Sequence, residues 1–190
     1  SVRGVVSVSD SADTTTGGIA GINHGTLISC QFTGVVTGDS EVGGIVGRNE
    51  SEGTIDHSTA RAIVTGKSST GGIAGYNLGA ITGCTNVGSI NTEYPEASLD
   101  TDGFTAKMVD YINNKMAAAN DDATNSVTNV ATDTGGIAGR SSGMILTSVN
   151  TGTIGYEHVG YNVGGIVGRT DGLVSGCVNQ GRVLGRKDVG

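Results

Sequence analysis

Three cysteines are the residues of this sequence most suited to act as a nucleophile or a metal ligand. Cys30, Cys84 and Cys177 occupy one position of a repeated pattern, and Ser58 and Ser148 fill that position in the two copies between them. If the copies stack, cysteines two copies apart are separated by about 9.6 Å, which is too far for a disulfide. We therefore expect three buried, unpaired thiols that fill a tight inward corner.

A catalytic cysteine would need a histidine placed to activate its thiol. His57 is adjacent to the cysteine position without sharing it, and the three histidines occupy different positions of the repeat: His24, His57 and His158. Histidines at different positions do not stack into a metal cluster. We therefore expect surface histidines and no catalytic cysteine.

Acidic residues recur in the segments before each Gly-Gly pair, at Asp13, Asp39, Glu41, Glu93, Glu157 and Asp188. A column of carboxylates is a possible Ca²⁺ site, but Lys67 interrupts this one and the Gly-Gly-x-Gly-x-Asp nonapeptide is absent. We interpret these segments as solvated turns. The sequence predicts no catalytic, cofactor-binding or metal-binding residue.

Charged residues also do not converge as a glycosidase or polysaccharide lyase would require. The charges within the repeats, such as Arg48, Asp56, Arg61 and Arg182, belong to different positions. Aromatic platforms for sugars are few, with Tyr76, Tyr156 and Tyr161 as the main candidates. An ice-binding surface would need a column of threonines, whereas the expected outward column reads Val35, Ala62, Ser89, Thr153 and Arg182.

Composition narrows the class of protein further. The 190 residues include 34 Gly, one Pro and no Trp, and 36% are hydrophobic. Glycine without a three-residue period excludes collagen, and regularly placed Ile and Val argue against disorder. The net charge of −7, with scattered basic residues, argues against nucleic-acid binding. No run of 18 apolar residues is present, so we expect no membrane span.

The tripeptide Gly-Gly-Ile recurs along the chain and marks the start of each copy of the repeat, so the position of each candidate residue can be counted from it. It begins at 17, 43, 71, 135 and 164, so the successive intervals are 26, 28, 64 and 29 residues. A period near 28 is typical of a solenoid with one repeat per coil, and the long interval is one repeat with about 36 extra residues. Each copy holds three short β-branched runs separated by turn residues.

Stacking predicts three aliphatic ladders inside the coils. The first is Ile19, Ile45, Ile73, Ile137 and Ile166; the second is Leu27, Ile55, Ile81, Ile145 and Val174; the third is Val36, Ile63, Ile90, Ile154 and Val183. Asn23, Asn49 and Asn77 predict an amide hydrogen-bond ladder, incomplete in the later copies. The predicted fold is an all-β, right-handed parallel β-helix of about five coils with three short strands per coil and one α-helical insert.

The predicted organisation has three parts. Solenoid coils occupy residues 1–91 and 134–190, and an insert with an amphipathic helix at about 102–119 occupies 92–133. The insert either packs on the solenoid or faces a partner. The first residue is Ser1, and the first and last segments look like parts of further coils, so we expect an excised fragment of a longer array with partly open ends.

The repeated block Gly-Gly-Ile-(Ala/Val)-Gly-x-Asn-x-Gly-x-Ile-x-x-Cys, followed by Gly-x-Val, resembles the GLUG motif. That motif is a short repeat of secreted and surface proteins of bacteria, including adhesin-like proteins and accessory regions of some IgA-specific metallopeptidases. The resemblance covers nearly the whole chain outside the insert, with Ile where the motif name has Leu. It implies a bacterial extracellular setting and a noncatalytic array, and it implies no particular ligand.

Three hypotheses of function follow. The first is a stalk-like or adhesin-like segment that contacts a host or extracellular protein, a glycan, or neighbouring repeats of the same longer chain. The second is a noncatalytic accessory region of a secreted hydrolase such as a peptidase, although no His-Glu-x-x-His occurs in these residues. The third is a carbohydrate-binding or carbohydrate-cleaving β-helix. None of these hypotheses requires a cofactor.

Overall fold

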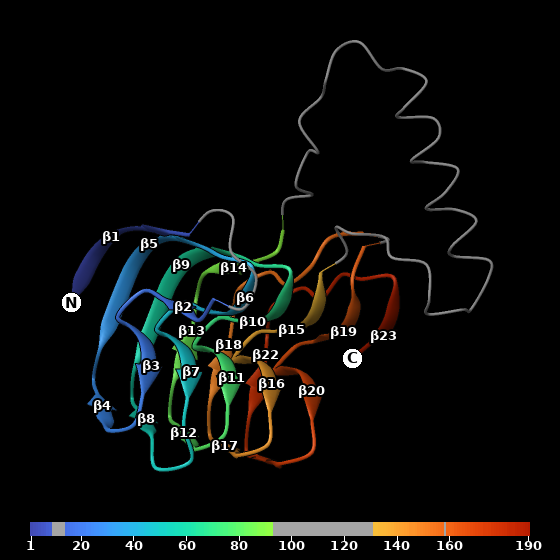
Figure 1. The fold of residues 1–190 in the computed structure, drawn as a ribbon. Helices are drawn as coiled ribbons and strands as arrows, with labels where there is room; N and C mark the ends of the chain where they lie inside the picture. The colour runs from blue at the N-terminus through green and yellow to red at the C-terminus, as the bar shows by residue number, and fades with distance from the viewer. Residues whose placement is uncertain (9–13, 93–130, 158) are drawn as a thin grey trace.

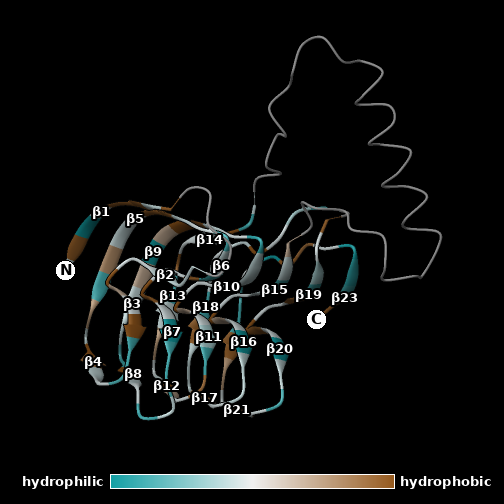
Figure 2. Cartoon of the chain, viewed as in Figure 1, coloured by the Kyte–Doolittle hydropathy of each residue, from teal (hydrophilic) through white to brown (hydrophobic). Residues whose placement is uncertain are grey.

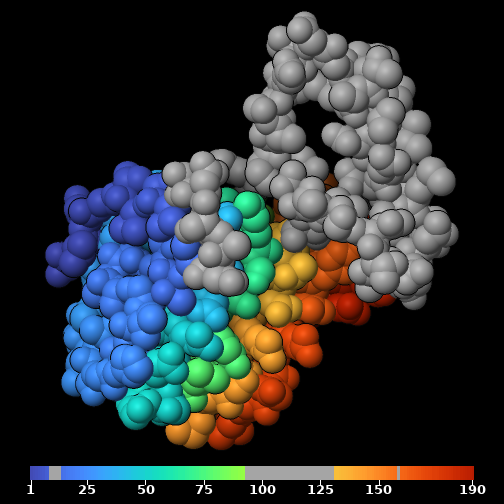
Figure 3. All heavy atoms as spheres, viewed as in Figure 1, coloured from blue at the N-terminus to red at the C-terminus, as the bar shows by residue number. Residues whose placement is uncertain are grey.

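The computed structural model shows a stack of coils, and it describes residues 1–8, 14–92, 131–157 and 159–190. Each coil passes through four parallel sheets, which we name A to D (Figure 1). Starting at its Gly-Gly pair, a coil leaves sheet B, crosses C and D, and returns along A. Colours from blue to red form adjacent bands on the surface, because successive coils lie next to one another (Figure 3).

The strands of each sheet follow one another from coil to coil. Sheet A contains β1 (Val2–Ser7), β5 (Gln31–Thr37), β9 (Thr59–Thr65), β13 (Thr85–Asn86), β18 (Val149–Asn150) and β22 (Val178–Asn179), with β14 (Ser89–Ile90) also paired to β9. Sheet B contains β2 (Thr16–Gly17), β6 (Ser40–Gly43), β10 (Ser68–Gly71), β15 (Thr132–Gly135), β19 (Tyr161–Gly164) and β23 (Lys187–Val189). Sheet C contains β3 (Ala20–Asn23), β7 (Val46–Asn49), β11 (Ala74–Asn77), β16 (Ala138–Ser141) and β20 (Val167–Thr170). Sheet D contains β4 (Thr26–Ile28), β8 (Thr54–Asp56), β12 (Ala80–Thr82), β17 (Met144–Leu146) and β21 (Leu173–Ser175).

The parallel solenoid of about five coils is confirmed, but each coil passes through four sheets of short strands rather than three. The additional strands form sheet B, in the segments predicted from the sequence to be acidic turns; Glu41 lies in β6 and Asp188 in β23. Hydrophobic periodicity does not predict these strands. The buried residue before the final glycine of the strand is Thr in three coils, at Thr16, Thr70 and Thr134, so no alternation of aliphatic residues appears. The right-handed sense of the coils stays a prediction.

The long interval leaves the stack in register. β10 of the third coil pairs directly with β15 of the fourth, and Gly71 is opposite Gly135. Thr132 and Asp133 belong to β15, so the last residues assigned to the 92–133 insert are part of a coil. The helix predicted at about 102–119 lies outside the described residues.

Aliphatic ladders form the core, and apolar residues recur in the strands from coil to coil (Figure 2). The first two ladders are confirmed, because backbone bonds link Ile45 to Ile73 and strand pairing places Ile55 beside Ile81. The third ladder was wrong by one residue in the second coil. Val36 pairs with Val64, which is fully buried, whereas Ile63 pairs with Val35 and is 44% exposed. The true outward column is therefore Val35, Ile63, Ser89, Thr153 and Arg182.

The second glycine of each Gly-Gly pair allows the two sides of the narrow coil to touch. A Cβ at Gly18 would meet the ring of Phe32, and one at Gly136 would meet the side chain of Asn150 and the carbonyl of Gly165. The same cross-core contact recurs between Gly44 and Ala60 and between Gly72 and Asn86. Glycine is thus required at this column by close approach rather than by its backbone angles.

Two ladders of buried polar side chains run through the stack. In the first, which the sequence predicts, Asn23 donates to Asn49 (2.8 Å), Asn49 donates to Asn77 (2.9 Å), and Asn77 donates to the hydroxyl of Ser141 (3.1 Å). In the second, which was not predicted from the sequence, the amide of Asn86 donates to Asn150 (2.7 Å) and that of Asn150 donates to Asn179 (2.8 Å). Each ladder satisfies its buried amides while it links neighbouring coils.

Candidate functional site

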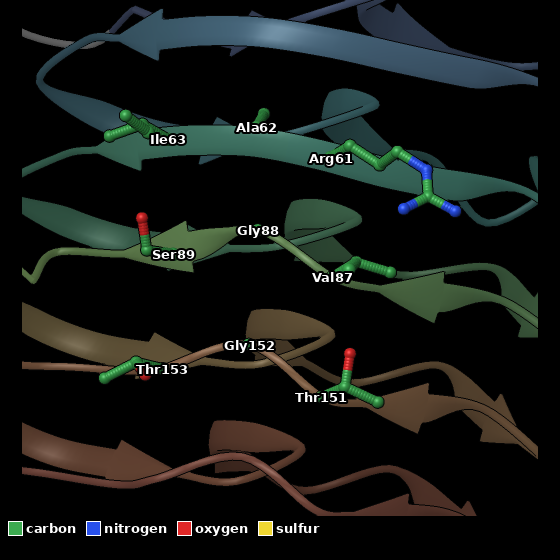
Figure 4. A pocket seen from close by; sticks show the side chains of 9 residues that line it. All are labelled: Arg61, Ala62, Ile63, Val87, Gly88, Ser89, Thr151, Gly152 and Thr153. Carbon is green, nitrogen blue, oxygen red and sulfur yellow. The ribbon is translucent and has the colours of Figure 1, made fainter.

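A groove of about 380 Å³ crosses three coils on the outer face of sheet A. Arg61, Val87 and Thr151 form one row, and Ile63, Ser89 and Thr153 form the other (Figure 4). Between the rows lies a floor of Ala62, Gly88 and Gly152. Each of the second, third and fourth coils therefore contributes one residue to each row and one to the floor.

The groove lies where sheet A changes shape. β5 and β9 are continuous strands of seven residues, whereas in the third coil the chain breaks at Val87 and Gly88 between β13 and β14. The side chain of Asn86 holds this break, because its oxygen accepts the Gly88 N–H (3.1 Å) and its amide donates to the Gly88 carbonyl (3.1 Å). In the first two coils the position of Asn86 is occupied by Phe32 and Ala60, whose apolar side chains form no such hydrogen bonds.

The same Asn-x-Gly turn repeats in the next two coils. Asn150 receives the Gly152 N–H at 3.3 Å and donates to its carbonyl at 2.9 Å, and Asn179 makes the equivalent bonds with Gly181, both at 3.1 Å. The third position of this turn must be glycine, because a Cβ at Gly88 would meet the Ala62 carbonyl and one at Gly152 would meet the Gly88 carbonyl. The second asparagine ladder thus sets the floor of the groove.

The lining combines alkyl groups, hydroxyls and one cation. Ile63 and Val87 are 44% and 41% exposed, which leaves apolar surface on both rows. The Thr151 hydroxyl donates to the Asn86 carbonyl (3.1 Å) and keeps its lone pairs available as acceptors. Ser89 and Thr153 add two further half-buried hydroxyls. These groups can pack against a ligand and form hydrogen bonds with it.

Arg61 is the charged group of the groove, and it forms no ion pair with any described residue. Two other arginines are paired: Arg48 lies 3.7 Å from Glu41 and 3.4 Å from Glu50, and Arg182 lies 3.2 Å from Glu157. The exposed guanidinium of Arg61 therefore projects beside a lining without negative charge.

The cysteine column predicted from the sequence is present, and its members form a hydrogen-bond ladder. The Cys30 N–H donates to the Ser58 hydroxyl (3.1 Å), the Ser58 N–H to the Cys84 sulfur (3.4 Å), and the Cys84 N–H to the Ser148 hydroxyl (3.2 Å). All three thiols are unpaired, as predicted. Only Cys84 is buried, because Cys30 and Cys177 lie in the outermost complete coils and are half-exposed.

Burial raises the pKa of the Cys84 thiol to about 11. Its single S–H has two carbonyl acceptors within reach, Thr82 (3.4 Å) and Ile55 (3.5 Å). A protonated, enclosed thiol is a poor nucleophile, so the structure supports the structural role expected for this column.

The remaining candidate residues are dispersed. His57 lies on the surface, with its Nδ1 2.8 Å from Asp56; His24 is exposed, and His158 lies outside the described residues. Asp13 and Glu93 also lie outside them. Among the described residues no group of three or more His, Cys, Asp or Glu side chains is arranged to hold a metal ion.

The tyrosines proposed as sugar platforms are partly occupied by arginine. The guanidinium carbons of Arg48 and Arg140 each lie 5.3 Å from the centre of the Tyr76 ring, so both neighbours in its column stack on it. Arg186 stacks on Tyr161 at 5.4 Å. Tyr156 is 43% exposed. None of the three lines the groove.

A family model described as the GLUG motif matches residues 38–65. This stretch includes the whole of β6, β7, β8 and β9, which is one complete passage through the four sheets. The chain therefore carries a GLUG motif, as the sequence resemblance indicated. Neither a search of curated proteins nor a search of solved structures finds a match. In the described part of the chain, no helix has the length and apolar character needed to cross a membrane.

Proposed function

We propose that this chain is a noncatalytic structural and interaction segment of a bacterial cell-surface or secreted protein, either stalk-like or adhesin-like. The observation that carries the proposal is the stacking of the coils by backbone pairing and side-chain ladders, with a GLUG motif in the second coil. Such a scaffold separates or displays other parts of a protein and resists proteolysis, because opening one coil breaks pairings to two neighbours.

The nature of the exposed surface supports binding over catalysis. The groove supplies hydroxyls, alkyl groups and a guanidinium. The Cys84 thiol lies inside the solenoid, away from this surface, and burial keeps it protonated. The alternative is an accessory region of a secreted hydrolase, such as an IgA-type peptidase, which the resemblance to GLUG-motif proteins implies. In both cases the partner is an extracellular protein or glycan, or the neighbouring repeats of a longer chain.

Antibodies raised against this chain test the location. We expect labelling of intact cells of the source organism, or recovery of the antigen from the medium, without permeabilisation. Labelling that appears only after permeabilisation would overturn the proposal. Assays of the purified chain against protein and polysaccharide substrates test the second part, and turnover in either assay would refute a noncatalytic role.

A further inference from the structure

We propose that the groove on sheet A binds an acidic oligosaccharide, with Arg61 facing a sugar carboxylate. This inference rests on the proposed interaction function and adds the chemical class of the ligand. The groove is defined by its two rows and its floor, and it is open toward solvent on one face of the solenoid (Figure 4).

The lining matches the two kinds of surface that a pyranose presents. Ring C–H groups pack on the exposed alkyl groups of Ile63 and Val87, which lie on opposite rows. Sugar hydroxyls both donate and accept, as do the side chains of Ser89 and Thr153, while the Thr151 oxygen accepts. The second and third coils each contribute one alkyl and one polar side chain to the rows, and the fourth coil contributes two hydroxyls, so one sugar chain lying across the coils meets both kinds of contact.

The position of the groove favours a glycan over an extended peptide. A peptide strand gains most of its affinity by pairing its backbone with a free sheet edge. The groove instead lies on the face of sheet A, where Val87 and Thr151 already donate their backbone N–H groups to Ala60 and Asn86. Recognition here depends on side chains, and three of the six row residues carry hydroxyls.

Charge selects an acidic sugar. The Arg61 guanidinium makes no ion pair with a described residue, and the lining contains no carboxylate to repel an anion. A guanidinium pairs with a carboxylate through two parallel hydrogen bonds, which suits the carboxyl group of a uronic acid. This positive group is notable in a chain of net charge −7.

Calorimetric titration of the whole chain with a galacturonate hexamer, in the presence of a chelator to remove Ca²⁺, tests the proposal. We expect saturable binding, weaker binding of the methyl-esterified hexamer, and about a tenfold loss of affinity in Arg61→Gln. Arg169→Gln is the matched control, because Arg169 is exposed on sheet C, away from the groove, and we expect it to bind as the unchanged protein does.

Absence of binding, an equal loss in both arginine variants, or tighter binding of a hexa-aspartate peptide would each overturn the inference. Circular dichroism of each variant verifies that the coils are intact. A Ser89→Ala variant adds a second readout, since loss of a hydroxyl contact lowers affinity for the ester and the acid alike. The cell-labelling result is independent of this titration, so failure of the ligand assignment is distinguishable from failure of the proposed function.

Discussion

Substitution of Asn150 by Ala tests the second asparagine ladder, which links coils and shapes the groove floor. The Asn150 side chain is fully buried and makes four hydrogen bonds: it accepts from Asn86 (2.7 Å) and from the Gly152 N–H (3.3 Å), and it donates to Asn179 (2.8 Å) and the Gly152 carbonyl (2.9 Å). At about 1 kcal/mol net for each bond, the variant loses about 4 kcal/mol of unfolding free energy.

Asn179→Ala is the matched control, because Asn179 occupies the same column in the last complete coil. Its bonds with Gly181 are exposed and it has one ladder partner, Asn150, so we expect a loss of about 1 kcal/mol. Guanidinium unfolding followed by far-UV circular dichroism measures both variants. A loss below about 1 kcal/mol in Asn150→Ala, or equal losses at the two positions, would refute the argument that the buried ladder stabilises the stack.

Three further perturbations test the core, the thiol column and the close glycine contact. Val64→Ala is expected to cost about 2 kcal/mol and Ile63→Ala less than about 1 kcal/mol in chemical unfolding, and the reverse order would restore the ladder first predicted from the sequence. The pKa of Cys84 is raised from 9.0 to about 11, so between these pH values the folded chain keeps a thiol proton that the unfolded chain releases. The contribution of this thiol to the unfolding free energy is therefore full below pH 9, and it falls by about 3 kcal/mol as the pH rises through 11. Stability measured from pH 8 to 11 should therefore decline less steeply in Cys84→Ser, and identical slopes would contradict the assignment. Gly136→Ala is expected to cost about 3 kcal/mol in thermal or chemical unfolding, because its Cβ meets a neighbouring carbonyl, whereas Gly25→Ala, with open space around it, should be close to neutral.

The sequence was sufficient to predict the parallel stack because its repeats preserve the spacing between the Gly-Gly pair, the aliphatic positions and the Cys/Ser position. Two ladders and the thiol column follow directly from that spacing. The single-residue error at Ile63 arose because Ile63 and Val64 are both aliphatic, so side-chain type does not decide which one faces inward. Strand pairing with Val35 and Val36 decides it.

Sheet B and the groove depend on features that hydrophobic periodicity does not report. The strands of sheet B bury Thr16 and Thr70, whose type suggests a turn as readily as a core position. The groove depends on a bend that Asn86 imposes through bonds to Gly88. The recurrence of Asn-x-Gly two residues after the Cys/Ser column in the last three copies was the signal in the sequence that could have located this bend.

A distance between the two ends of one column tests the stacked architecture most directly. Thr26 and Leu173 belong to the same column of sheet D, and pairing connects them through Thr54, Ala80 and Met144. With Cys30, Cys84 and Cys177 replaced by Ser, which the column already contains, nitroxide labels at Thr26→Cys and Leu173→Cys are measured by double electron–electron resonance. Four coil spacings predict a single narrow distribution near about 19 Å. A broad distribution centred beyond about 40 Å, as expected for unstacked chain of this length, would contradict the account.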